Sequence, residues 1–199
     1  MSRDFRAWID AVDGLGLLKT VEGADWDEEI GAITDANSKR NKYTLLFDKV
    51  KDHPEGFRLL TGALLDSRRV ALALGLSPSL NDLELVTVLR EKMKTAGQKL
   101  AEFAPREVKD APVMENSLDP VDMLKFPAPK YFEGDGGRYI GTAHAVMTRD
   151  PDSDWVNMGV YRMMVQDRNT LSILFEAVRH ARFCKKIRSE RYHSIRRGH

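Results

Sequence analysis

Apolar positions along this chain follow two different periods, and the change from one to the other comes near residue 105. Before it, stretches with apolar side chains at helical spacing alternate with short apolar runs, which is typical of helices alternating with strands. The predicted helices cover residues 2–14, 25–41, 66–75 and 81–103. The predicted strands cover residues 17–21, 43–47 and 57–61. This order predicts an N-terminal α/β domain over residues 1–105.

Several of these helices begin with residues that cap helix N-termini. Ser2 is expected to cap the first helix, and Asp66 or Ser67 the third, because their side-chain oxygens can accept from free backbone N–H groups. Asp25 and Glu28 have the spacing of a capping box at the start of the second helix.

A connector is predicted over residues 106–130, with one short helical turn near residues 121–124. It is marked by prolines at positions 105, 112, 120, 127 and 129. These prolines interrupt helix and strand alike, so the connector separates two differently built parts of the chain.

After the connector, the apolar period changes to two. Residues 139–148 and 156–165 both alternate as strands, and the turn-rich residues 150–154 join them, so a β-hairpin is predicted. Residues 171–175 are expected to add a third strand. The predicted fold class is therefore α+β, with residues 131–199 forming a partial, mostly β domain.

Composition excludes several classes of protein. At 199 residues, with 42% hydrophobic and 31% charged residues, the chain is typical of a globular protein. No apolar run approaches the roughly 18 residues of a membrane span, and the first residues lack the apolar core of a signal peptide. Cys184, the only cysteine, excludes an internal disulfide. A cytoplasmic protein without a membrane partner is expected.

The charge is unevenly distributed. Residues 179–199 carry a net charge of +7, with eight Lys or Arg against Glu190 alone, although the whole chain has only +1. Such a tail can bind nucleic acid, or it can be a solvated terminus. Phe183 and Tyr192 are the only aromatic residues among these charges. Because so few aromatic side chains are available to stack on bases, we favour the solvated terminus over nucleic acid as a partner.

Three features are weak candidates for a binding or catalytic site. The glycine-rich residues 133–137 have neither Walker A nor dinucleotide-binding spacing, so they predict a turn entering a strand rather than a phosphate cradle. His144 lies between alanines in a predicted strand, where a packed histidine is expected more often than a ligand. Cys184 has His180 four residues away but no third orienting group, which argues against a cysteine hydrolase.

The strongest candidate site combines Asn157, Arg162 and His180. An Asn carbonyl and a His imidazole suit a divalent cation such as Mn²⁺, and an arginine can hold a carboxylate or phosphate with two parallel hydrogen bonds. Strict strand alternation places positions 157 and 162 on opposite faces. They can share a pocket if the strand bulges at Gly159 or ends between them. The alternative is Asn157 in a turn and Arg162 in a surface ion pair.

These stretches resemble the UbiD family of decarboxylases, which depend on prenylated FMN. The resemblance rests on residues 3–5, 26–33, 46–47, 67–75, 133–142, 148–152, 155–164 and 179–180. It implies an N-terminal α/β domain followed by the start of a flavin-reductase-like split β-barrel. It further implies that Asn157 and His180 bind Mn²⁺, with K⁺ nearby, and that Arg162 is catalytic. The cofactor-binding residues that it implies are Asn157, Val160, Tyr161, Arg162, Leu174, Phe175, Glu176, Arg179 and His180.

The resemblance implies reversible, non-oxidative decarboxylation of a small aromatic or α,β-unsaturated carboxylic acid. A flavin prenyltransferase would supply the cofactor, and a homo-oligomer is expected. Family members are more than twice as long, and their acid/base glutamates and third metal ligand come after the part that this chain matches. Ala177 and Val178 replace the Pro-Gly of the family. The chain is therefore expected to be an N-terminal portion that is inactive alone. The alternative is a non-catalytic subunit or binding module completed by a second chain.

Overall fold

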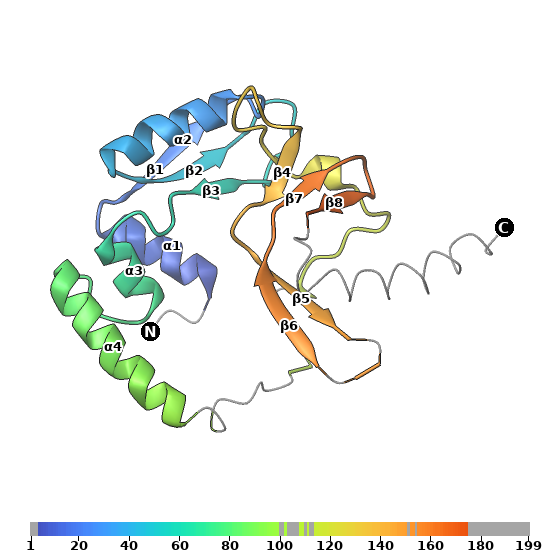
Figure 1. Ribbon diagram of the computed structural model, residues 1–199. Helices are drawn as coiled ribbons and strands as arrows, with labels where there is room; N and C mark the ends of the chain where they lie inside the picture. The colour runs from blue at the N-terminus through green and yellow to red at the C-terminus, as the bar shows by residue number, and fades with distance from the viewer. Residues whose placement is uncertain are drawn as a thin grey trace.

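The computed structural model describes residues 4–99, 102, 108–109, 111, 114–150, 152–153 and 155–174. Its helices are α1 (Phe5–Gly14), α2 (Glu29–Arg40), α3 (Ser67–Ala73), α4 (Asp82–Gln98) and the 3-10 turn η3 (Met123–Lys125). Its strands are β1 (Leu18–Glu22), β2 (Thr44–Asp48), β3 (Leu59–Thr61), β4 (Arg138–Gly141), β5 (Ala145–Arg149), β6 (Val156–Val160), β7 (Met163–Val165) and β8 (Leu171–Ile173). Figure 1 shows their arrangement. None of the described helices combines the length and apolar character that a membrane crossing needs.

The first three strands form the centre of the N-terminal part, which we call the N-terminal unit (residues 4–99). β1 and β2 are parallel and α2 joins them, whereas β3 is antiparallel to β2. Helix α2 covers one face of this sheet, and α1 and α3 lie on the other side (Figure 1). The predicted α/β alternation is confirmed.

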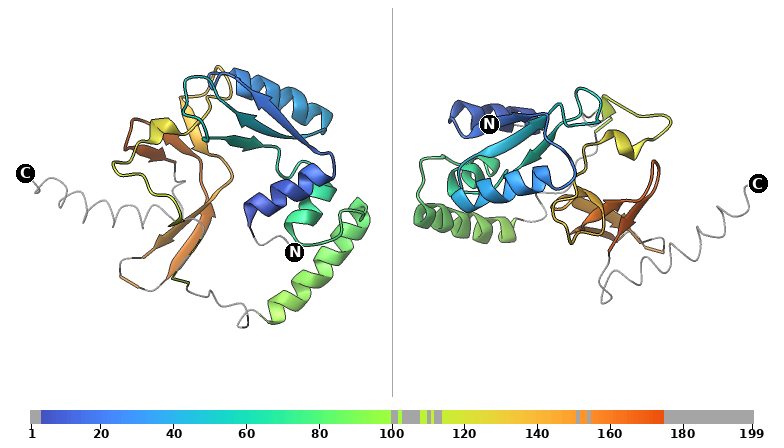
Figure 2. Two further views of the ribbon diagram at one scale, coloured as in Figure 1. Left: turned by 180° about the vertical axis from the view of Figure 1, so that it is seen from behind. Right: turned by 90° about the horizontal axis from the view of Figure 1, so that it is seen from above.

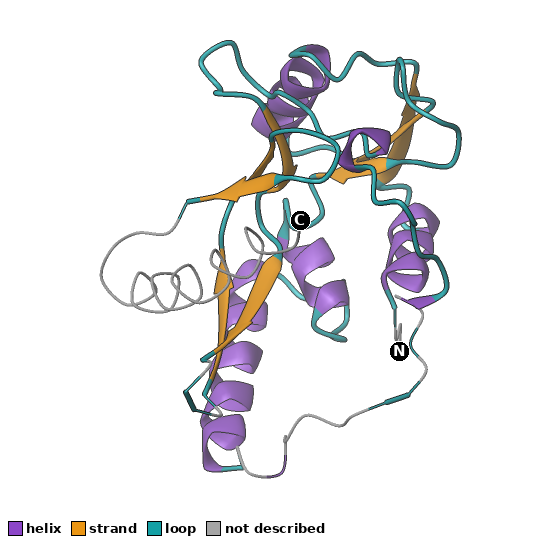
Figure 3. Ribbon diagram, turned by 90° about the vertical axis from the view of Figure 1, so that its right-hand side faces the viewer, coloured by secondary structure: helices purple, strands orange, loops and turns teal. Residues whose placement is uncertain are grey.

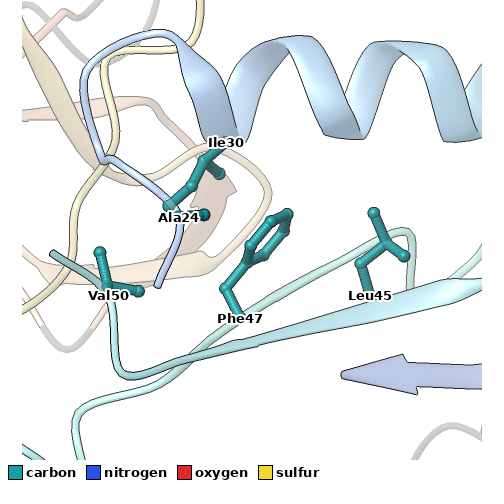
Figure 4. Close-up of a cluster of buried hydrophobic side chains, with 5 residues drawn as sticks. All are labelled: Ala24, Ile30, Leu45, Phe47 and Val50. Carbon is teal, nitrogen blue, oxygen red and sulfur yellow. The ribbon is translucent and has the colours of Figure 1, made fainter. Parts of the chain in front are cut away.

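The core of the N-terminal unit has two parts. Between α2 and the sheet lie the buried side chains Ala24, Ile30, Leu45, Phe47 and Val50 (Figure 4). On the other side, α1 contributes Trp8 and Val12, which pack with Leu17 and with apolar residues of β3 and α3. Because β2 is the central strand, its first four side chains are all buried, on both faces.

The predicted caps of α1 and α3 differ in outcome. Helix α1 is capped by Asp4, whose carboxylate accepts from the Ala7 N–H at 2.8 Å, so the prediction of Ser2 is wrong. Helix α3 is capped by Asp66, one of the two residues predicted, which accepts from the Arg69 N–H at 3.0 Å. A cap lies next to the first helical residue, and α1 begins later than the apolar spacing suggested.

The predicted capping box of α2 is also wrong. Glu28 has left-handed backbone geometry and no side-chain cap bond, because its N–H donates to the Lys130 carbonyl at 2.9 Å. The Asp25 N–H donates instead to the Glu29 carboxylate at 2.7 Å. A capping box does form at α4, between Asn81 and Glu84. Local spacing alone missed the tertiary contact that redirects the start of α2.

Beyond the connector, each of the two long predicted strands is broken into two. The prediction over residues 139–148 becomes β4 and β5, and the prediction over residues 156–165 becomes β6 and β7. β5 and β6 form the predicted hairpin, whereas β4, β7 and β8 form a separate sheet. The hairpin projects away from that sheet (Figure 1, Figure 3). The described strands therefore make small separate sheets and no closed barrel.

Residues 126–138 join the two halves, which lie side by side (Figure 2). The Lys130 N–H donates to the Trp26 carbonyl at 3.1 Å, and the Lys130 side chain pairs with the carboxylate of Glu28. Gly31 of α2 lies against the Tyr131 backbone, where an added Cβ would come within 1.8 Å of the carbonyl oxygen. Only glycine allows this approach of the connector to α2.

Arg138 at the start of β4 makes the second part of this joint. Its guanidinium donates to the carbonyls of Ala128 at 2.9 Å and Phe126 at 3.2 Å, and it lies 2.8 Å from His53 Nε2. It also stacks over the ring of Trp26, 4.4 Å from the centroid. Burial lowers the pKa of Arg138, although arginine stays charged at any physiological pH. One cation thus ties β4 to the N-terminal unit.

Candidate functional site

The β5–β6 hairpin decides where Asn157 lies. Its strands pair in register, with Thr148 opposite Asn157 and Val146 opposite Gly159. Along β6, side chains alternate between an exposed face, which carries Met158, and a half-buried face, which carries Asn157. Asn157 therefore lies in a strand, and the alternative that placed it in a turn is wrong.

Arg162 lies just beyond the end of β6. The pairing of β5 with β6 shows no register shift at Gly159, so the strand does not bulge there. β6 ends at Val160 and β7 begins at Met163, which leaves Tyr161 and Arg162 between the two sheets. Positions 157 and 162 could share a site if the strand bulged at Gly159 or ended between them. The structure has the second arrangement, because the strand ends between them. Arg162 is exposed.

Tyr161 turns back toward the half-buried face of the hairpin. A Cβ added at Gly159 would lie 2.6 Å from Tyr161 Cε2 and 2.8 Å from its hydroxyl oxygen. The aromatic ring therefore covers Gly159, two positions along the strand from Asn157. A side chain at position 159 would displace the ring, so this glycine is needed for close packing.

The sheet of β4, β7 and β8 brings Arg162 and Leu174 to the same end. Met163 is paired with Ile173 of β8 and with Gly141 of β4. Arg162 and Leu174 are the next residues outward from the Met163–Ile173 pair, and both are exposed. The chain crosses from this sheet to the β5–β6 hairpin at the same end. Two segments that were predicted to contact one cofactor therefore meet at the junction of the two sheets.

The rest of the predicted site belongs to the C-terminal part of the chain. Phe175, Glu176, Arg179 and His180 lie outside the described residues, as do Cys184 and the basic tail. Among the residues that are described, no three His, Cys, Asp or Glu side chains gather in a way that would hold a metal ion. The metal pair of Asn157 and His180 therefore stays a prediction.

Two buried polar atoms at the hairpin are without a hydrogen-bond partner among the described residues. They are the side-chain nitrogen of Asn157 and the hydroxyl oxygen of Thr148. Nearly all buried polar atoms in folded proteins have a partner. Both atoms therefore fit a polar group that comes from outside this part of the chain. An oxygen of a phosphate could accept from both of them, so the residues present fit the phosphate end of a bound nucleotide.

Two weaker candidates have structural roles. His144 lies in the bend before β5 rather than in a strand, and its ring packs over Gly141 with Nε2 3.0 Å from the sulfur of Met163. In the glycine-rich loop, the Asp135 carboxylate accepts from two backbone N–H groups, those of residues 131 and 132. The loop leads into β4 as a turn, as predicted, and the packed histidine is confirmed.

Thr148 is the residue that reasoning from the sequence missed. The alternation over residues 145–149 places it on the same side of its strand as Val146. The short loop over residues 150–154 closes the hairpin, and the Asp150 N–H donates to the Trp155 carbonyl at 3.0 Å. Counting outward from that pair would have placed Thr148 opposite Asn157. The signal was therefore present in the hairpin register.

Comparison with known families agrees with this arrangement. Residues 9–93 match the N-terminal domain of 3-octaprenyl-4-hydroxybenzoate carboxy-lyase, UbiD. Residues 106–195 match the Rift-related domain of the same carboxy-lyase. The chain belongs to the UbiD family. The boundary between the two matches falls where the apolar period of the sequence changes.

Individual relatives extend the comparison. The chain is 35% identical over 179 residues to a pyrrole-2-carboxylic acid decarboxylase from Pseudomonas aeruginosa. This match covers 85% of this chain and 35% of that protein. Its fold is similar to the vanillic acid decarboxylase of Sedimentibacter hydroxybenzoicus in closed form, with a TM-score of 0.78 at 25% identity, over 96% of this chain and 41% of that one.

A third relative was solved with a cofactor. An evolved dimeric form of the UbiD-class enzyme HmfF from Pelotomaculum thermopropionicum, in complex with prFMN, has a TM-score of 0.74 at 28% identity. The similarity covers 94% of this chain and 42% of HmfF. The chain thus spans about a third of the length of the curated relatives it matches.

Proposed function

We propose that this chain forms part of the prenylated FMN site of a UbiD-type carboxy-lyase. The enzyme to which it contributes would decarboxylate, or carboxylate, an aromatic or α,β-unsaturated carboxylic acid. Two observations support this proposal together. One is the family, whose solved relatives include an enzyme in complex with prFMN. The other is the buried side-chain nitrogen of Asn157, which lacks a hydrogen-bond partner within the described part of the chain.

The finer features of the proposal follow from the same family. The small sheets of β4–β8 would belong to a split β-barrel domain that begins over residues 131–199 and is completed by further strands. It would follow an N-terminal domain over residues 1–105 and a connector over residues 106–130. Asn157 would bind Mn²⁺ through its amide oxygen together with His180, with K⁺ close by. The enzyme would act as a homo-oligomer on a small carboxylic acid and receive its cofactor from a flavin prenyltransferase.

The described residues have distinct parts in this scheme. Prenylated FMN would supply the electron sink for carbon–carbon bond cleavage. Asn157 would hold the phosphate end, with its amide oxygen toward the metal and its amide nitrogen donating to the phosphate. Arg162, exposed beyond β6, binds the substrate carboxylate with its planar guanidinium, which offers two parallel donors. Tyr161 would contact the flavin, whereas Val160, a contact that the family resemblance also implies, lies on the opposite, exposed face of β6 from Asn157.

Flavin retention tests the proposal directly. The 199-residue chain is produced together with a flavin prenyltransferase in medium with added Mn²⁺, and bound flavin is identified by absorbance and mass spectrometry. We expect the purified chain to retain flavin and the Asn157→Ala variant to lose most of it. We expect the same chain to release little CO₂ alone, because the acid/base glutamates that the family resemblance implies are not among its predicted site residues, and an arginine by itself cannot complete proton exchange. A wild-type chain that binds neither prenylated FMN nor FMN with Mn²⁺ contradicts the proposal.

A second candidate is a subunit or binding module completed by another polypeptide. It is favoured by the outer face of the β5–β6 hairpin, where Met147, Met158 and Val160 are 72%, 70% and 64% exposed. A two-stranded hairpin with an apolar face is marginal by itself. Co-expression with a polypeptide that carries the rest of the family sequence distinguishes the candidates. A stable complex that gains decarboxylase activity would show a completed enzyme, and a stable complex without activity would show a binding subunit.

A further inference from the structure

We propose that Thr148 is a phosphate-binding residue, whose hydroxyl donates to a phosphate oxygen of the flavin nucleotide next to Asn157. This inference deepens the proposed function and rests on it. It assigns to β5 a part in the site, whereas the residues predicted from the sequence lie on β6 and beyond. The site would then be held by both strands of the hairpin.

The argument begins with the pairing of the two strands. Thr148 and Asn157 are directly opposite each other in antiparallel register. Side chains at such positions have Cβ atoms about 5 Å apart, within reach of one shared partner. Both residues lie on the half-buried face of the hairpin. Two polar side chains thus converge from neighbouring strands.

The second step is that neither side chain satisfies the other. The hydroxyl oxygen of Thr148 and the amide nitrogen of Asn157 are both buried, and neither finds a hydrogen-bond partner within the described residues. A buried polar atom without a partner costs roughly 1–3 kcal/mol. A fold that places two such atoms opposite each other gains stability only when a third polar group binds between them.

Other buried polar atoms without partners do not form such a pair. The indole nitrogen of Trp8 belongs to α1, far from the hairpin in the sequence. Nδ1 of His144 is also buried without a partner among the described residues, but His144 precedes β5, outside the paired residues of the hairpin, and its ring packs over Gly141. Arg69 has two nitrogens without a hydrogen bond, but its charge is compensated by the Asp66 carboxylate, 3.0 Å from Nη1. Thr148 and Asn157 differ because they are paired across two strands on one face. That convergence points to a ligand rather than to a local packing defect.

Donor chemistry selects the ligand. The amide nitrogen of Asn157 can only donate, and the hydroxyl of Thr148 can donate to the same atom. One acceptor with several lone pairs satisfies both, and a phosphate oxygen is such an acceptor. A carbonyl of the flavin ring would have lone pairs for both donors too, so the experiment must separate the phosphate from the ring.

FMN and riboflavin make that separation, because riboflavin has the same ring without the phosphate. Their dissociation constants are measured with the 199-residue chain by fluorescence quenching, in the presence of Mn²⁺. We expect Thr148→Val to weaken FMN binding roughly 10- to 100-fold, as expected for one hydrogen bond to a charged group, and to leave riboflavin binding unchanged. Thr148→Ser keeps the hydroxyl and should retain FMN affinity. Thr87→Val, the same change on the exposed surface of α4, should have no effect on either flavin.

Thermal unfolding without flavin gives a second, independent measurement. Because the hydroxyl lacks a partner inside the described protein, Thr148→Val should unfold at a temperature no lower than the wild-type chain. A large drop would show that the hydroxyl is bonded within the protein, and the inference would be overturned. That result would also explain any failure of the variant to fold.

Two binding outcomes separate this inference from the proposed function. If Asn157→Ala loses FMN but Thr148→Val keeps the wild-type preference for FMN over riboflavin, only the role of Thr148 is overturned. If the wild-type chain binds neither flavin, the proposed function falls and the inference falls with it.

Discussion

The N-terminal unit and the β region that follows it differ in the kind of side chain that they bury. The N-terminal unit has apolar clusters on either side of its sheet, with Phe47, Ile30 and Val12 fully buried. Among the described residues from 114 to 174, which include the β region, the buried apolar residues are only Pro127, Ala128, Pro129 and Val165. Its hairpin also exposes large apolar side chains and buries polar atoms without partners.

The difference teaches that the two halves bury different kinds of group, apolar side chains in the first and unpartnered polar atoms in the second. Apolar burial stabilises the first half without help from a ligand. In the second half, the side-chain nitrogen of Asn157 and the hydroxyl of Thr148 are buried without a hydrogen-bond partner among the described residues, and the proposed flavin phosphate would supply one. Stability and binding are thus divided between the two parts, and the joint around Arg138 and Lys130 connects them.

The largest expected effect tests whether the N-terminal unit carries the stability. Phe47→Ala removes a fully buried side chain and should lower the free energy of unfolding by about 3–5 kcal/mol. Met158→Ala on the exposed face of the hairpin is the control and should change it by less than about 0.5 kcal/mol. Chemical denaturation of both variants measures the contrast. Equal losses would contradict the division between the two halves.

The next effect concerns the joint. Gly31→Ala places a Cβ against the Tyr131 carbonyl, and we expect a loss of about 1–3 kcal/mol from overpacking. Exchange of the backbone amide hydrogens should become faster over residues 126–131, where the connector packs against α2. Gly97→Ala in α4 meets no atom within 4 Å and should instead be neutral or stabilising, by up to about 1 kcal/mol. If both substitutions change the free energy of unfolding equally, the close approach at Gly31 does not contribute to stability.

The smallest effect is a pH dependence within the N-terminal unit. Burial raises the pKa of Asp66, but hydrogen bonds from the Arg69 N–H and from Arg68, with the charge of Arg69, outweigh it and lower the pKa below 3.8. A lowered pKa in the fold means that the ionised carboxylate stabilises it. This stabilisation is complete above the unfolded value of 3.8 and is lost as the pH falls through the lower folded value.

Asp66→Asn tests this sign, because asparagine also caps helices well. At pH 7 the variant should be less stable by about 1 kcal/mol or more, since buried Arg69 loses its counter-charge. Urea unfolding at several pH values should show the difference between the two proteins narrowing below pH 3.8. A difference that stays constant down to the lowest pH would remove Asp66 as the cause.

Much of the fold could be predicted from the sequence because the signals are local. The α/β alternation, the Asp66 cap, the turn at residues 133–137 and the β5–β6 hairpin all follow from spacing or turn composition. The errors arose where distant segments intervene. The capping box of α2 failed because Glu28 pairs with Lys130, and that pairing is invisible to a local pattern.

The candidate site was predictable only in part. The residue types and the order of Asn157 and Arg162 indicated a polar site, and the family resemblance gave it a chemistry. Strand alternation alone placed the side chains at positions 157 and 162 on opposite faces, because alternation assumes one unbroken strand. Thr148 was missed since its significance depends on which residue lies across the hairpin.

The sequence by itself determined the two-part architecture, the family and the residue types at the site, because apolar periodicity and turn residues act over short distances along the chain. Tertiary structure alone decided that the long strands break, that Gly31 and Arg138 hold the halves together, and that Thr148 faces Asn157. Those features depend on contacts between residues far apart in the sequence, whose energies no single segment contains.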